Sequence, residues 1–86
     1  MTKVFVFFYL MRSDPSGIRE AVPEHVAYWK GAGLDGYRGG PFADRSGGLI
    51  TFRAANLEEA TAIVARDPFV RRGLLQERWT KEWLPE

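Results

Sequence analysis

The first apolar segment of the chain, residues 3–11, predicts a β-strand. It is rich in β-branched and aromatic residues, lacks helical spacing and ends at a turn-rich segment, residues 13–17. Both faces of this strand are apolar: one would carry Val4, Val6, Phe8 and Leu10, and the other Phe5, Phe7, Tyr9 and Met11. A strand with one face in water would alternate with polar residues instead. We therefore expect helices to cover one face and a second copy of the chain to cover the other.

The first helix is predicted over residues 19–32, with Pro23 near its first turn, where a missing N–H is harmless. Its apolar stripe consists of Val22, Val26 and Trp29. His25 lies beside this stripe, so the helix would bring the single histidine of the chain close to the core.

The remaining elements are joined by short connections and complete the order β-α-β-β-α-β. They are a glycine-rich strand at about 34–40, a loop at 41–47, a strand at 48–54, a helix between the N-cap Asn56 and Asp67, a helical turn at 68–72 and a last strand at 75–84. Two right-handed crossovers on one sheet predict an α+β fold, the ferredoxin-like arrangement, with a four-stranded antiparallel sheet and both helices on one face. The bare face would then form a homodimer.

Composition predicts a single globular domain, residues 1–86, because 86 residues leave no room for a second core. A hydrophobic content of 45% is too high for a disordered chain. With no cysteine, neither disulfides nor thiolate-bound metals can strengthen so small a domain, which makes association of copies a natural remedy.

Charge and hydropathy argue against nucleic acid and membrane as partners. Twelve basic and eleven acidic residues give a net charge of +1, without the concentrated basic stripe of a nucleic-acid binder. The N-terminal apolar run is too short to span a bilayer and lacks a signal-peptide cleavage site. We expect a soluble cytoplasmic protein.

The single histidine narrows the chemistry that the chain can perform. Near neutral pH, His25 is the one obvious carrier for proton transfer. One histidine and scattered carboxylates do not supply the three or four converging ligands of a metal site. The glycines do not follow a phosphate-loop or dinucleotide spacing, so we expect no cofactor.

Two acidic turn motifs, residues 39–44 and 67–70, provide the other candidate site residues. The N–H groups of Gly39 and Gly40, before Pro41, could hold a substrate oxyanion, although a tight strand exit is an equally good interpretation. The aromatic members of the motifs, Phe42 and Phe69, could line an apolar pocket or pack in the core.

The loop after the glycines adds Asp44 and Ser46 to the candidate substrate-binding residues. Asp44 could orient the loop, form an Asx-turn with Ser46, or serve as an alternative partner of His25. Ser46 could act as a nucleophile or a hydrogen-bond donor, but no neighbouring residue would activate it.

These motifs, taken in order, resemble the YCII-related (YciI-like) family over nearly the whole chain. They are His25 on the first helix, Gly40-Pro41-Phe42, Asp67-Pro68-Phe69-Val70 before Gly73-Leu74, and an ending rich in tryptophan. The family is similar in fold to the dimeric α/β barrels, in which two sheets pack face to face. The resemblance implies a catalytic His–Asp pair in a cleft near the dimer interface.

In this chain the implied pair is His25 and Asp67. A carboxylate that accepts from one imidazole nitrogen holds the ring in one tautomer, and the other nitrogen can then take and return a proton. Alternatively, Asp67 simply caps the short helix that begins at Pro68. Many relatives carry a basic residue one turn before the histidine, whereas this chain has Val22 there, and Arg19 lies a further turn back.

Three functions fit these observations. The leading one is a small cofactor-independent enzyme, an isomerase or a lyase of the dehydrochlorinase type, that transfers a proton on a small, ring-derived molecule. The second is a non-catalytic ligand-binding or accessory dimerisation module, since fold does not determine function. The third, by analogy of fold alone, is an oxygen-using monooxygenase.

Overall fold

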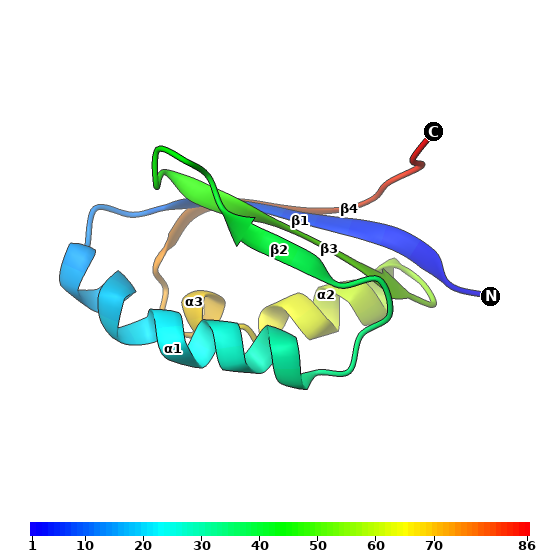
Figure 1. Ribbon diagram of the computed structural model, residues 1–86, viewed down its shortest axis with the longest axis horizontal. Helices are drawn as coiled ribbons and strands as arrows, with labels where there is room; N and C mark the ends of the chain where they lie inside the picture. The colour runs from blue at the N-terminus through cyan, green and yellow to red at the C-terminus, as the bar shows by residue number, and fades with distance from the viewer.

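One antiparallel sheet with three helices on a single face makes up the fold (Figure 1). The computed structural model describes all residues, Met1–Glu86. Its elements are β1 (Lys3–Met11), α1 (Pro15–Gly31), β2 (Arg38–Pro41), β3 (Gly47–Ala54), α2 (Leu57–Ala65), α3 (Pro68–Arg71) and β4 (Leu75–Glu82). The strand order is β2-β3-β1-β4, and every pair is antiparallel. The predicted ferredoxin-like arrangement is confirmed.

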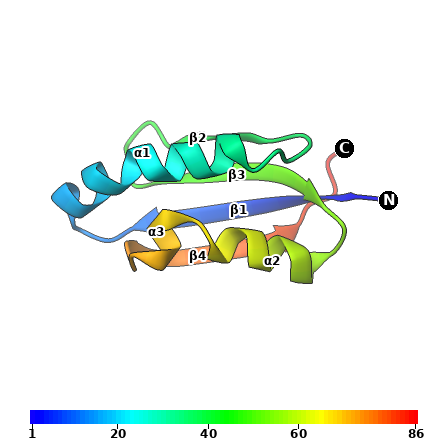
Figure 2. The same cartoon turned by 90° about the horizontal axis from the view of Figure 1, so that it is seen from below.

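Figure 2 shows how the helices divide the sheet between them: α1 runs along β2 and β3, while α2 and α3 lie along β1 and β4. The core lies between these two layers. Its buried members are Phe5, Phe7, Tyr9, Ala21, Trp29, Ile50, Phe52, Ala54, Ala60, Val64, Phe69 and Leu74.

The central strand β1 has two apolar faces, as its sequence predicted. Phe5, Phe7 and Tyr9 are buried beneath the helices, whereas the alternate residues are only half-buried. We call the surface without helices the open face; it carries Val4, Val6, Phe8, Leu10, Leu49 and Trp79.

Helix α1 begins four residues earlier than the sequence predicted. Asp14 is its N-cap, and the Asp14 carboxylate accepts from the Gly17 N–H at 3.1 Å, while Pro15 occupies the first turn. The segment interpreted as a turn is therefore a helix start. Pro23 consequently lies inside the helix, where it removes one interior backbone hydrogen bond, and the expectation that it belongs to the first turn was wrong.

The prediction for the second strand was wrong in its position. Strand β2 has only four residues and starts at Arg38, because Gly36, with a φ of +66°, turns the chain just before it. Gly39 and Gly40 pair with β3 instead of forming a turn. The turn follows them, closed by a hydrogen bond from the Phe42 N–H to the Gly47 carbonyl at 2.8 Å.

The second half of the chain follows the prediction more closely. Asn56 caps α2 by accepting from the Glu59 N–H at 2.8 Å, while the Glu59 carboxylate accepts from Ala55 instead of closing the capping box on Asn56. Gly73, with a φ of +67°, ends the segment that contains α3. Strand β4 ends two residues before the predicted limit.

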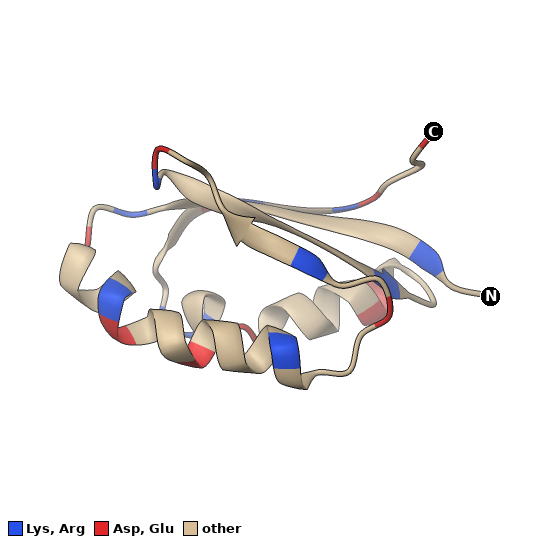
Figure 3. Cartoon of the chain, in the orientation of Figure 1, with Lys and Arg blue, Asp and Glu red and all other residues tan.

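Charged residues of both signs are interspersed along α1, the hairpin tip and the strand ends (Figure 3). None of the helices combines the length and the apolar character that crossing a membrane requires.

The Asp14 cap leads to a test of the helix start. Replacing Asp14 by Ala should lower the free energy of unfolding by about 0.5–2 kcal/mol, because the Gly17 N–H loses its acceptor. Urea denaturation followed by circular dichroism measures this change. The exposed Asp35 has no side-chain partner, so Asp35→Ala is the matched control and should change stability by less than about 0.5 kcal/mol. Equal losses in both variants would contradict the assigned cap.

Candidate active site

The site is built around a buried contact between His25 and Asp67, two residues that are far apart in sequence. The His25 Nδ1 and Asp67 Oδ1 atoms are 2.8 Å apart. His25 comes from the middle of α1, and Asp67 immediately precedes α3. Only 9% of His25 and none of Asp67 is exposed to solvent. The predicted pair is therefore in direct contact.

Three donors converge on the Asp67 carboxylate. Besides His25, the Trp29 indole donates to Oδ2 at 3.0 Å and the Phe69 N–H donates to Oδ1 at 2.8 Å. Trp29 lies four residues after His25 on α1, so the two rings project from one face of the helix. Asp67 thus caps α3 and holds His25 at the same time. The helix cap and the histidine partner, which the sequence offered as alternatives for Asp67, are therefore both present.

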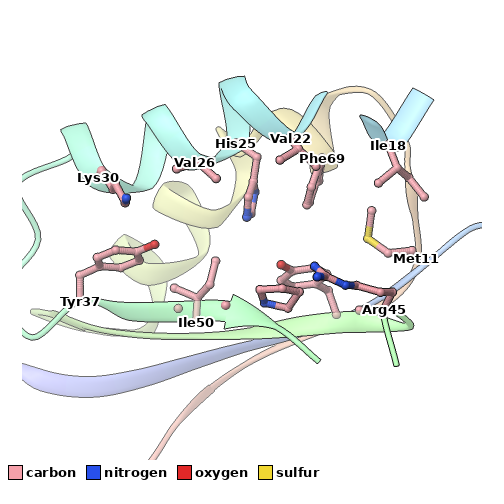
Figure 4. A pocket seen from close by; sticks show the side chains of 15 residues that line it. Met11, Ile18, Val22, His25, Val26, Lys30, Tyr37, Arg45, Ile50 and Phe69 are labelled. Atoms are coloured by element: carbon pink, nitrogen blue, oxygen red, sulfur yellow. The ribbon is translucent and has the colours of Figure 1, made fainter. Parts of the chain in front are cut away.

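This network determines which nitrogen of His25 is available. Because a carboxylate accepts only, Nδ1 carries the hydrogen in this contact and Nε2 is left as an acceptor. The imidazole stacks on the Phe69 ring with centroids 3.9 Å apart and meets the Tyr9 ring edge-on at 6.0 Å. Figure 4 shows the imidazole pointing from α1 into a cavity.

A cavity of about 340 Å³ lies between α1, the sheet and the β2–β3 hairpin. Its walls are mainly apolar, and its lining residues are Tyr9, Met11, Ile18, Val22, His25, Val26, Lys30, Tyr37, Gly39, Gly40, Pro41, Arg45, Gly47, Ile50 and Phe69. The cavity lies on the helix side of the sheet, and the position of a cleft relative to a dimer interface stays a prediction. The cavity and the open face are on opposite sides of the sheet.

The structure separates the predicted substrate-binding residues into two groups. Four of them line the cavity: Gly39, Gly40, Pro41 and Phe69. Phe42, Asp44 and Ser46 do not line it. The Phe42 ring packs against Phe8 of the open face, with centroids 5.3 Å apart. Gly39 contributes by lacking a side chain, since a Cβ there would lie only 2.9 Å from Ile50, whereas a Cβ at Gly40 would meet no atom within 4 Å.

Asp44 is engaged with Ser46 and not with His25. Its carboxylate accepts from the Ser46 hydroxyl at 2.7 Å and from the Ser46 N–H at 2.9 Å. These bonds, the hydroxyl bond foremost, lower the pKa of Asp44 below its ordinary value. Of the alternatives considered for Asp44, the Asx-turn is the one that the structure contains, and the partnership with His25 was wrong.

Sequence reasoning missed several polar residues of the cavity. Tyr9 looked like a core residue because it stands in an apolar strand, and burial and the nearby Asp67 raise its pKa above the ordinary value. No sequence motif contains Lys30, Tyr37 or Arg45, so nothing in the sequence pattern marked them as cavity residues. Trp29 was assigned to the apolar stripe, although its spacing of four residues from His25 could have indicated a shared acceptor.

No group of three or more His, Cys, Asp or Glu side chains is placed to share a metal ion. The chemical capacity of the site lies in one oriented imidazole, two phenol side chains and two cationic side chains around an apolar space.

Comparisons with solved structures identify chains of the same fold. 5-Chloro-2-hydroxyhydroquinone dehydrochlorinase (TftG) from Burkholderia phenoliruptrix, in complex with 2,5-dihydroxybenzoquinone, has 22% identity and a TM-score of 0.77, with 94% of this chain and 93% of that chain covered. A dimeric ferredoxin-like protein from Thermobifida fusca has 11% identity and a TM-score of 0.58, with 96% and 90% covered. SnoaB from Streptomyces nogalater, a cofactor-independent oxygenase, has 13% identity and a TM-score of 0.53, with 98% and 92% covered.

A comparison with curated proteins gave no match. The model of the YCII-related domain matches residues 6–84, which is almost the entire chain. On this match, and with the ferredoxin-like fold in agreement, the chain belongs to the YCII-related domain family.

Proposed function

We propose that this protein is a small cofactor-independent enzyme that transfers a proton on a small, ring-derived substrate, as in an isomerisation or the elimination of hydrogen chloride. The contact between His25 Nδ1 and the buried Asp67 carboxylate, at 2.8 Å, carries the proposal. A cap for α3 needs only the bond from the Phe69 N–H. The additional bonds from His25 and Trp29 orient the imidazole, and its second nitrogen is free at the cavity.

In the proposed reaction, His25 Nε2 takes a proton from a carbon of the substrate. In an elimination, the electron pair of the broken C–H bond forms a new double bond, and a leaving group such as chloride departs with its own pair. In an isomerisation, the pair forms a new double bond while the electrons of an existing double bond move to another carbon, and no group leaves. The proton then passes from His25 to water, or returns to another carbon if the reaction is an isomerisation. Asp67 is a positioning residue that stabilises the imidazolium formed in between.

The size of the cavity and the comparisons support a small-molecule reaction. A volume of about 340 Å³ is within the range of ligand pockets, and its apolar walls would exclude water from a bound ring. TftG is named as a dehydrochlorinase and SnoaB as a cofactor-independent oxygenase, so this fold serves small-molecule enzymes, and one of these two is named as working without a cofactor. General acid–base catalysis supplies roughly 10²–10⁴-fold, and positioning in the cavity would supply the remainder.

We also propose that the protein is a homodimer formed through the open face. That face has half-buried apolar side chains on β1 and includes Trp79, which is 40% exposed; Trp83, directly after β4, is 50% exposed. Contiguous apolar surface of this kind marks an interaction site. The Thermobifida fusca protein of similar fold is described as dimeric. Such pairing would leave the two cavities open on the outer, helix-covered sides.

Replacing His25 by Gln should lower turnover by roughly 10²–10⁴-fold, because the side chain loses its exchangeable base while keeping similar volume. Chloride release from 5-chloro-2-hydroxyhydroquinone, together with solvent-proton exchange into a panel of small phenols and lactones, measures turnover. Glu58 is exposed and remote from the cavity, so Glu58→Gln is the control. Full turnover in the His25 variant would refute the proposal, and binding without turnover by the wild type would favour the ligand-binding module.

Asp67→Asn separates a positioning role from a purely structural one. An amide offers one acceptor oxygen to three donors, so the free energy of unfolding should fall by about 1–3 kcal/mol. Turnover at saturating substrate should fall as well, because the imidazole loses its tautomer control. Trp29→Phe is the comparison: it also removes a donor bond to Asp67, but it keeps the His25 contact. Similar stability losses with equal turnover in both variants would contradict the role assigned to Asp67.

The dimer is tested by placing a charge on the open face. Trp79→Glu should convert the protein to a monomer, because a carboxylate in a packed interface would lose its hydration without gaining a partner. Sedimentation velocity measures the mass. Leu57 on α2 is also an exposed apolar residue, but it lies on the helix side, so Leu57→Glu should keep the wild-type mass. A Trp79 variant that stays dimeric would exclude this face.

A further inference from the structure

The cavity lining contains two cationic side chains and no carboxylate, and the buried Asp67 carboxylate contacts His25 outside the lining. Its lining includes Lys30 and Arg45 besides His25, and no Asp or Glu. The ion pairs of the structure join Lys3 to Glu82, His25 to Asp67 and Arg72 to Glu24, so neither Lys30 nor Arg45 is paired. Unpaired cations beside apolar walls attract an anion into such a space.

Arg45 has an unusual backbone conformation that directs its side chain to the cavity. It is the only residue other than glycine with a positive φ, +64°. The conformation is held locally: the Arg45 N–H donates to the Phe42 carbonyl at 2.9 Å, and Asp44 and Ser46 on either side bond to each other. Figure 4 shows the Arg45 side chain extending from the hairpin toward the cavity interior, with Lys30 at the other end and His25 between them.

The hydroxyl of Tyr9 is a neutral donor without a partner in the protein. Tyr9 is only 4% exposed and lines the cavity, and no protein group hydrogen-bonds its hydroxyl. Every side-chain nitrogen or oxygen that is fully enclosed has a partner in this structure, so the Tyr9 hydroxyl is not fully enclosed. Gly48, opposite Tyr9 in the β1–β3 register, leaves room for this hydroxyl, because a Cβ there would overlap it. Since burial raises the pKa of Tyr9, the hydroxyl keeps its proton and can donate.

We infer that the cavity selects a substrate that carries its negative charge on a ring oxygen, of the phenolate or enolate class, and that Arg45 determines this selectivity. The inference rests on the proposed function, because it treats the cavity as the substrate site. The Tyr9 hydroxyl would donate a hydrogen bond to the substrate oxyanion, and Arg45 would supply the positive charge. Arg45 lies just before β3, which begins at Gly47, and the next residue, Gly48, is opposite Tyr9.

The test uses 4-nitrophenol, whose visible spectrum distinguishes the phenolate from the phenol, and 4-nitroanisole, a neutral analogue that cannot ionise. At a fixed pH near neutrality, the wild type should bind 4-nitrophenol as the phenolate and more tightly than 4-nitroanisole. Arg45→Ala should weaken phenolate binding by about tenfold, as loss of a charge-assisted contact does, and leave 4-nitroanisole binding unchanged.

Two further variants identify the contributing groups. Arg19→Ala removes one exposed positive charge from α1 outside the cavity, so it should bind the phenolate as the wild type does. Tyr9→Phe keeps the ring in the core and removes the hydroxyl, so it should lower phenolate affinity while leaving 4-nitroanisole affinity and the far-ultraviolet circular dichroism unchanged.

The outcomes distinguish this inference from the proposed function. The inference is overturned if Arg45→Ala and the wild type bind the phenolate with equal affinity. It is also overturned if the wild type binds 4-nitroanisole as tightly as the phenolate, or binds neither compound. The proposed function survives those results if His25→Gln still abolishes turnover. Conversely, weakened phenolate binding in Arg45→Ala with full turnover in His25→Gln supports the inference and removes the assigned base.

Discussion

The packing of this small domain depends on hydrogen bonds to one buried carboxylate, that of Asp67. Asp67 is completely enclosed, and a carboxylate removed from water is costly unless donors replace its hydration. One donor comes from its own helix, at Phe69, and two come from α1, at His25 and Trp29. The position of α1 over the sheet and the orientation of the imidazole therefore have a common cause. The exposed Arg72–Glu24 pair joins the same elements but contributes at most about 1 kcal/mol.

The alternation of side chains along β1 separates the candidate site from the surface proposed for dimerisation. Tyr9 points to the helix side and lines the cavity, while its neighbour Phe8 points to the open face, where its ring meets Trp79 with centroids 5.1 Å apart. One strand thus supplies both surfaces, yet the pleat keeps them on opposite sides of the sheet. Contacts between copies on the open face would support the cavity floor from behind without entering it.

The sequence predicted the order of the elements because that order depends on local patterns: apolar strands, caps and turn residues. It predicted the pair of His25 and Asp67 for two reasons: the order of the motifs resembles the family, and a carboxylate is a suitable hydrogen-bond partner for an imidazole. The start of α1 was missed because Asp14, Pro15 and Gly17 are turn formers as well as helix starters. The donor role of Trp29 and the free hydroxyl of Tyr9 depend on contacts between distant segments, and a tyrosine in an apolar strand looks like any other core residue. Arg45 could not be found because its direction depends on a backbone φ that sequence pattern does not reveal.

The two chemical roles that we propose for the cavity fall on parts of the fold that differ in rigidity. His25 stands on a long helix and is held by a buried network, so its geometry changes only if the core changes. Arg45 is an exposed residue on the β2–β3 hairpin, where the surrounding hydrogen bonds are local. In the proposed reaction the base must be accurately placed, whereas the group that recognises charge can act over a longer distance. A rigid helix for the base and a surface hairpin for the cation satisfy these two requirements within 86 residues.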